Sequence, residues 1–176
     1  MSQSRLDNLP DTARVWAFAS DRELDEQMRS ELHLSLTAFL DRWAAHRAAL
    51  VAGYEIVEDR FLVIAVNEDV ARASGCSIDA LMRHLDSLES DLGIGLLDSS
   101  AVWFRDHEGA VISAPRPDWI RLASSGDVGE QTPVFDLTIA DLGSYRRGDL
   151  ERLAADAWHA RLLGLAGLPT ADGSTS

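Results

Sequence analysis

Hydrophobic and polar positions divide the first two thirds of the chain into short apolar runs and longer periodic segments. The runs at residues 15–20, 61–66 and 101–106 are rich in β-branched and aromatic side chains, which is typical of strands. In residues 54–57, Tyr54 and Ile56 alternate with Glu55 and Val57, as in a strand with one half-wet face. We therefore predict four strands here, the second and third joined by a charged bend at residues 58–60.

Two segments between these strands repeat apolar residues at spacings of three and four, which lines up one face of a helix. The first follows Ser20, which opens the capping box "SDRE", and we expect it to run to about His46. The second is expected to begin at Ser74 or Ser77 and to end at Gly93 or Gly95. The predicted apolar stripes are Leu24, Met28, Leu32, Leu36, Phe39, Leu40 and Trp43, and then Ile78, Leu81, Met82, Leu85 and Leu88.

The order β-α-β-β-α-β predicts an α+β fold of the ferredoxin-like kind, in which the first and third strands lie at the centre of the sheet. Both helices then cover one face, so the last third of the chain or a second subunit must bury the other. We expect a ferredoxin-like unit over residues 12–113 and a small α/β extension packed on it over residues 114–166. The polar tail, residues 167–176, is expected to be disordered.

The last third supplies its own pattern of turns and elements. A hairpin is predicted with its bend at residues 106–109, and a short helix is predicted to stop at Gly126. The segment "TPVFDLTI" is predicted as a strand. A final helix is expected to begin at Asp149, which is a suitable capping residue.

Composition excludes several activities. The formal net charge is -13, so nucleic acid and anionic membranes are poor partners. All 16 basic residues are arginine, which excludes a lysine Schiff base, a Ser-Lys dyad and the phosphate-binding lysine of a P-loop.

The expected cellular location is inferred from sequence features that are missing. One cysteine cannot form an internal disulfide. The polar N-terminus does not resemble a signal peptide, and no apolar run approaches the roughly 20 residues that span a bilayer. We therefore expect a cytoplasmic protein.

The one cysteine, Cys76, is the candidate for chemistry, because it lies where the second helix is expected to begin. Unpaired amides and the helix dipole at such a position stabilise a thiolate. A histidine would be needed beside it as a base, and either His46 or His159 is a candidate. In the other interpretation, Gly75 and Cys76 are small because the start of the helix packs tightly on the sheet.

A ligand site is a further hypothesis for the same turn. The amides of "SGC" form a nest able to hold a small anion, which makes Ser74, Gly75 and Ser77 candidate ligand-binding residues. Asp79 is a candidate base or an acid that complements the helix dipole. Trp158 on the last helix is a candidate pocket wall or a core residue. No metal-binding spacing occurs, "DHE" at residues 106–108 is interpreted as a solvated turn, and no cofactor is expected.

The stretches "FLDRWAAH", "FLVIAVNED", "SGCSID" and "TPVFD" together resemble an uncharacterised bacterial family, over most of residues 15–163. Some of its members are labelled "ABC transporter ATPase". A P-loop needs a lysine and a glycine spacing that this chain lacks, so we reject ATP hydrolysis of that kind.

A second resemblance covers residues 102–146. "VWFRDHEGAV" followed by "DWIRLASSGDVGEQTPVFD" is similar in layout to bacterial GYF-like domains, which implies a compact partner-binding unit. The Gly-Tyr-Phe signature is absent.

These patterns favour a non-catalytic binding or regulatory module, with an unknown protein or a small anionic ligand as its partner and a homodimer through the sheet as a possibility. The alternative is a cysteine-dependent enzyme or thiol redox sensor centred on Cys76.

Overall fold

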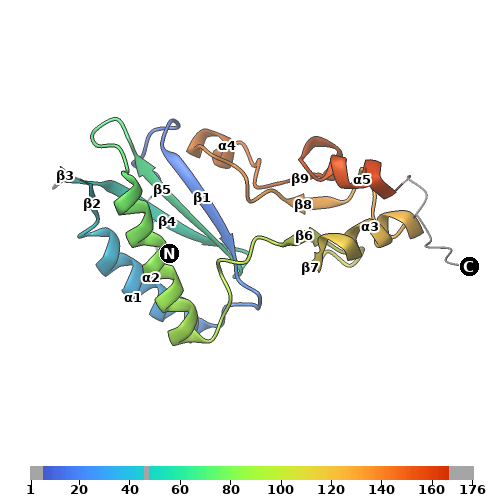
Figure 1. The fold of residues 1–176 in the computed structure, drawn as a ribbon, viewed down its shortest axis with the longest axis horizontal. Helices are drawn as coiled ribbons and strands as arrows, with labels where there is room; N and C mark the ends of the chain where they lie inside the picture. Colours follow the sequence, from blue (N-terminus) through green and yellow to red (C-terminus); the bar gives the residue numbers. More distant parts are fainter. Residues whose placement is uncertain (1–5, 46–47, 167–176) are drawn as a thin grey trace, which may run out of the picture. The chain divides into compact units, whose positions relative to one another are not determined.

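The computed structural model describes residues 6–45 and 48–166, and it mixes helices with sheets (Figure 1). The predicted α+β class is confirmed. The chain forms two compact units. Unit 1 comprises the residues up to Ser99 together with Leu137–Asp149, and unit 2 comprises Ser100–Asp136 together with the residues from Leu150 onward.

Unit 1 is built on a three-stranded antiparallel sheet of β1 (Arg14–Ala19), β4 (Val51–Val57) and β5 (Phe61–Asn67), in the order β1-β5-β4. The continuously apolar strand β5 lies in the centre, and its residues 61–66 are all buried. The bend between β4 and β5 has positive φ angles at Glu58 and Asp59, which confirms the predicted tight hairpin. A separate pair is formed by β2 (Ala44–Ala45) and β3 (Ala48–Ala49).

Helices α1 (Glu26–Leu40) and α2 (Gly75–Leu92) pack on one face of this sheet (Figure 1). Their predicted apolar stripes are confirmed for the leucines, which share one core with Ile64 and Tyr54. The predicted limits of α2 are confirmed as well. Ser74 caps its start, and Gly93 ends it with a φ of 64°.

The predicted limits of α1 are wrong at both ends. Ser20 does not cap it, because its amide donates to the carbonyl of Arg60 and so continues the pairing of β1 with the hairpin. Asp25 is the cap instead, accepting a 2.8 Å hydrogen bond from the amide of Met28. The helix ends at Leu40, and Trp43 packs into the core from the turn that follows.

Residues from the last third of the chain pair with the outer edge of β1 and reach the second face of the sheet. Val15 donates to the carbonyl of Ala140, and Leu142 donates to that of Ala13. On the following helix, α4 (Leu142–Arg146), Tyr145 reaches Glu55 of β4. Glu55 points away from α1 and α2, because its neighbours Tyr54 and Ile56 face them. The last third thus supplies α4 to this face, whereas the packing of the rest of residues 114–166 on the sheet and a second subunit stay predictions.

The sheet does not have the full ferredoxin-like order. The predicted fourth strand, β6 (Ala101–Arg105), belongs to unit 2, so β1 lies at an edge and not in the centre. Both edges of β6 are already occupied, since it pairs with β7 (Val111–Pro115) on one side and with β8 (Pro133–Phe135) on the other. The tight bend at residues 106–109 makes β7 the nearest partner.

Unit 2 is a four-stranded antiparallel sheet in the order β7-β6-β8-β9, with β9 at Glu151–Leu153. Helix α3 (Arg116–Ser125) ends at Gly126 as predicted, with a φ of 83°. A 3-10 turn, η1 (Ala154–Asp156), and helix α5 (Ala160–Ala166) follow β9. The core of the unit surrounds Trp119, Phe104 and Val134.

Two expectations for the last third are therefore corrected. The final helix does not begin at Asp149, because residues 151–153 pair with the free edge of β8. The division of the chain also differs from the expected boundary at residues 113 and 114, since unit 2 begins before β6 and residues 137–149 return to unit 1. The predicted disordered tail, residues 167–176, lies outside the described residues. Within the described ranges, no helix has both the length and the apolarity that a bilayer crossing requires.

Candidate functional site

The turn that carries Cys76 forms the N-terminal cap of α2. Ser74 accepts a 3.3 Å hydrogen bond from the amide of Ser77, and the Ser77 hydroxyl donates to the Ser74 carbonyl at 2.8 Å. The indole of Trp43 donates to the carbonyl of Ser77, also at 2.8 Å. The serine side chains and this carbonyl therefore stabilise the start of α2 and its packing on the core.

The tight-packing interpretation of Gly75 and Cys76 is wrong. A Cβ added to Gly75 would meet no atom within 4 Å, and the thiol of Cys76 is exposed. Asp79 is exposed too, and it lies beyond the first turn because the helix begins at Gly75. The small residues at this turn leave open surface, and close packing does not account for them.

Within the described residues of unit 1, no hydrogen bond joins a histidine to Cys76. His46 lies outside the described residues, and His159 belongs to unit 2 whereas Cys76 belongs to unit 1. In the described part of the chain, no hydrogen bond or ion pair joins Cys76 to another side chain. Catalysis at Cys76 and anion binding at its turn stay predictions.

His159 and Trp158 lie in the core of unit 2. The His159 imidazole is 1% exposed, stacks on Trp158 at 4.0 Å and meets the edge of Trp119 at 6.2 Å. Neither ring nitrogen has a hydrogen-bond partner among the described residues. Burial lowers the pKa of His159 to about 4, against the opposing effect of Asp136. The imidazole is therefore neutral at pH 7.

Trp158 is partly buried, and the guanidinium of Arg116 lies 5.1 Å from its ring centre. This arrangement is a cation–π contact at the edge of the core. It supports the interpretation of Trp158 as a core residue.

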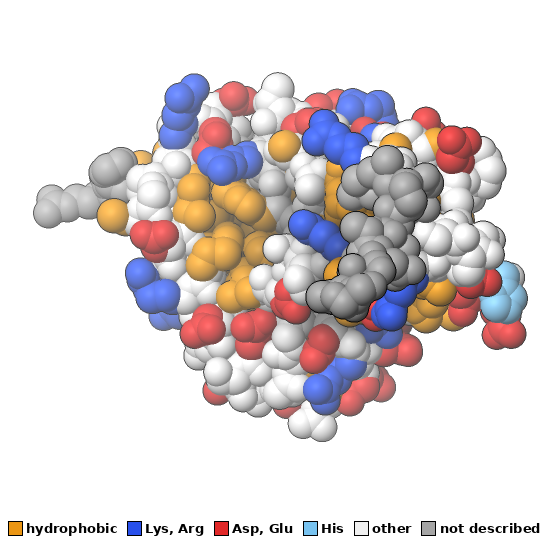
Figure 2. Space-filling model, turned by 45° about the vertical axis from the view of Figure 1, so that its right-hand side comes forward, with side chains coloured by type: hydrophobic (Ala, Val, Ile, Leu, Met, Phe, Trp, Pro, Cys, Tyr) orange, Lys and Arg blue, Asp and Glu red, His pale blue; other side chains and the backbone are white. Residues whose placement is uncertain are grey.

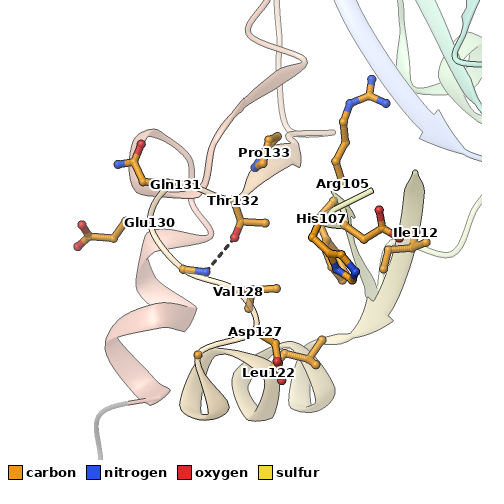
Figure 3. Close-up of a pocket in the computed structure, with 14 residues that line it drawn as sticks. Arg105, His107, Ile112, Leu122, Asp127, Val128, Glu130, Gln131, Thr132 and Pro133 are labelled. Carbon is orange, nitrogen blue, oxygen red and sulfur yellow. Dashed lines mark hydrogen bonds between the residues drawn. The ribbon is translucent and has the colours of Figure 1, made fainter. Parts of the chain in front are cut away.

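A groove of about 690 Å³ lies between the β6–β7 hairpin and the loop that joins α3 to β8 (Figure 3). We call it the hairpin groove. Phe104 and Val128 are buried beneath it, and Leu122, Ile112 and Pro133 add apolar surface to its sides. Its volume is within the usual range for ligand sites, and such sites are mostly apolar.

Hydrogen bonds hold the loop side of the groove in place. Gly129 donates to the Thr132 hydroxyl at 2.8 Å (Figure 3), and Thr132 donates to the Gly129 carbonyl at 3.0 Å. The Thr132 and Glu130 carbonyls accept from Ala154 and Ala155 of η1. The loop is thereby anchored at its base and on itself, so the groove is preformed.

The hairpin side is held in the same manner. One carboxylate oxygen of Asp106 accepts from the amides of Glu108 and Ala110, each at 2.9 Å, which confirms that "DHE" forms a turn. Arg105 forms a bidentate pair with Glu151 at 2.5 and 2.8 Å and donates to the Gly109 carbonyl. Among the described residues, no group of three or more His, Cys, Asp and Glu side chains is placed to hold a metal ion.

Sequence reasoning missed the hairpin groove, although it located both segments that form it. The bend at residues 106–109 and the Gly126 helix stop were predicted, but the pairing of β6 with β8 that sets their spacing was not. A loop with two glycines between a helix and a strand, facing a charged bend, was the available signal.

No protein-family model, curated protein or solved structure matches the chain in the comparisons made with each.

Proposed function

We propose that the chain is a non-catalytic binding module that holds a protein partner in the hairpin groove of unit 2. The observation that carries the proposal is a preformed groove with an apolar floor, walled by a hairpin and a loop that are both fixed by hydrogen bonds. Preformed sites bind more tightly because less conformational freedom is lost on binding. The GYF-like layout of the sequence around this groove supports the same proposal.

The lining favours binding over catalysis. Its hydroxyl group, on Thr132, already accepts a hydrogen bond from the loop, and its imidazole, on His107, is exposed on the hairpin. Among the described lining residues, no nucleophile is hydrogen-bonded to a base, which is the arrangement that covalent catalysis needs.

The shape of the groove favours a peptide over a small molecule. The groove is partly open to solvent, whereas small-ligand sites bury most of the ligand surface. Ile112 places one wall on β7, an outer strand of the four-stranded sheet. An extended peptide beside an outer strand can use both backbone and side-chain contacts.

The test is selection of randomised octapeptides displayed on phage, with the full chain as bait. Ile112→Ser removes an exposed apolar wall and should weaken the selected peptides about tenfold, since a buried isoleucine contributes roughly 1.5–3 kcal/mol. Leu34→Ser is the matched control, because Leu34 is 67% exposed on α1 of unit 1. Peptides that bind both variants equally well, or no enrichment at all, would refute the proposal.

The alternative, a thiol redox sensor at Cys76, has one observation in its favour. The thiol is exposed at the start of a well-capped helix, where a reagent or oxidant can reach it. Modification of Cys76 by a mild oxidant that changes the affinity for a partner would join the two functions.

The binding-module proposal has three further parts, which the sequence alone supports. They are a homodimer through the sheet of unit 1, ferredoxin-like kinship of that unit and a cytoplasmic location.

A further inference from the structure

The charges around the hairpin groove are unbalanced. Its lining contains three carboxylates, those of Asp106, Asp127 and Glu130, and one arginine, Arg105. Arg105 is bound to Glu151 through two hydrogen bonds, so its charge is already compensated. His107 is the other basic side chain of the lining.

The three carboxylates have no basic partner in the described part of the chain. Asp106 accepts from backbone amides, and Asp127 accepts from the hydroxyl of Ser125. The Glu130 side chain forms no hydrogen bond or ion pair with a described residue. In Figure 3, Asp127 lies beside Leu122, and Glu130 projects outward from the same loop. The apolar floor therefore has a carboxylate on its hairpin side, that of Asp106, and one on its loop side, that of Asp127, while Glu130 adds negative charge farther out on the loop.

We propose that the occupant of the hairpin groove is a peptide segment in which an apolar side chain is followed or preceded by an arginine or a lysine. This inference rests on the proposed function. The apolar side chain fits over Val128 and Phe104, and the basic side chain meets the carboxylates at the rim. Complementary charge of this kind selects the partner and speeds its association.

The overall negative charge of the chain does not by itself explain why a basic peptide would bind at the hairpin groove. The net charge is -13, and Figure 2 shows acidic and arginine side chains interspersed over the face in view. Any basic peptide is attracted weakly to such a surface. The groove differs because its carboxylates adjoin a preformed apolar floor, so that one peptide can use both.

The test extends the octapeptide selection to a charge variant. Asp127→Asn with Glu130→Gln removes two negative charges from exposed rim positions. Asp86→Asn with Asp91→Asn is the matched control, because it makes the same change of charge at exposed positions of α2 in unit 1. We expect the selected peptides to pair an arginine or lysine with an aliphatic or aromatic residue. The rim variant should bind them at least fivefold more weakly at low salt, with a smaller difference at high salt, and the control should bind them as the native chain does.

The outcomes separate this inference from the proposed function. Peptides that depend on Ile112 but are neutral or acidic, or that bind the rim variant with native affinity, would overturn the inference and leave the binding groove in place. Equal weakening by the rim variant and by the control would show that the attraction comes from net charge, which also overturns it. Peptides that do not depend on Ile112 would overturn both.

Discussion

The phenol of Tyr145 donates a 2.8 Å hydrogen bond to the carboxylate of Glu55, 90 positions earlier in the chain. The bond fixes α4 on the face of the unit 1 sheet that α1 and α2 leave open. Burial, with a further effect from the Glu55 carboxylate, raises the pKa of Tyr145 well above its ordinary value near 10. The phenol therefore remains protonated, and remains a donor, throughout the physiological range.

Tyr145→Phe should lower the free energy of unfolding by about 1–2 kcal/mol, because a partly buried carboxylate loses a donor. Urea denaturation followed by circular dichroism measures the loss. Glu55→Gln keeps an acceptor oxygen and should cost less. Native stability of the Tyr145→Phe chain would show that the bond does not hold α4 in place.

Stability should fall at mildly acidic pH because of His159. Its pKa is about 4 in the folded chain and about 6.5 in the unfolded chain, so the unfolded chain takes up the proton first as the pH falls. The contribution of the neutral His159 imidazole to the free energy of unfolding is therefore complete above pH 6.5. It decreases as the pH falls toward 4, by about 3 kcal/mol in all.

The variant His159→Phe isolates this effect from the titration of the many carboxylates. It replaces two unpartnered buried nitrogens by an apolar ring, so it should be as stable as the native chain at pH 7 or more so. Urea midpoints at pH 7 and pH 4.5 should differ less for the variant than for the native chain. Parallel pH profiles for the two chains would contradict a buried neutral imidazole.

Cys76 should react with a thiol reagent in the folded chain, because it is exposed. The disulfide reagent DTNB should modify one thiol per chain without denaturant. Cys76→Ser should change the free energy of unfolding by less than about 0.5 kcal/mol, as is usual for surface substitutions. Reaction that requires unfolding would place the thiol in the interior, contrary to the structure.

Two glycines at the ends of α2 should respond to alanine in opposite directions. Gly93 has a φ of 64°, where a Cβ is strained, so Gly93→Ala should cost about 1 kcal/mol. Gly75 has open space around it and no positive φ, so Gly75→Ala should be neutral or stabilise by up to about 1 kcal/mol. Thermal unfolding of the two variants side by side tests the contrast, which equal shifts would remove.

The sequence predicted those elements whose causes are local. The stripe of leucines in α2, its Ser74 cap and its Gly93 stop were all predicted, because cap, period and breaker act within a few residues. The hairpin bends were predicted for the same reason. Strand partners were not, since β6 could pair with β1 or with β8 and nothing in its own residues decides between them. The limits of the predicted units and the location of the hairpin groove depended on that choice.

The candidate site at Cys76 shows the same limit. The pattern "SGCSID" correctly indicated a helix start. Whether Gly75 and Cys76 are closely packed or exposed depends on which residues lie over them, and this is a property of the tertiary structure. The burial of His159 likewise depends on tertiary packing, because its ring lies against Trp119 of α3 and against Trp158 of the turn that precedes α5.

Residues 137–149 belong to unit 1 but lie in the sequence between two segments of unit 2, so the two units alternate along the chain. Because the segment carries Tyr145, unit 1 cannot complete its folding during synthesis until the ribosome has added about 50 residues beyond Ser99. Neither unit can be released intact by a single proteolytic cut. A fragment that stops at Ser99 should thus expose a bare sheet face and aggregate.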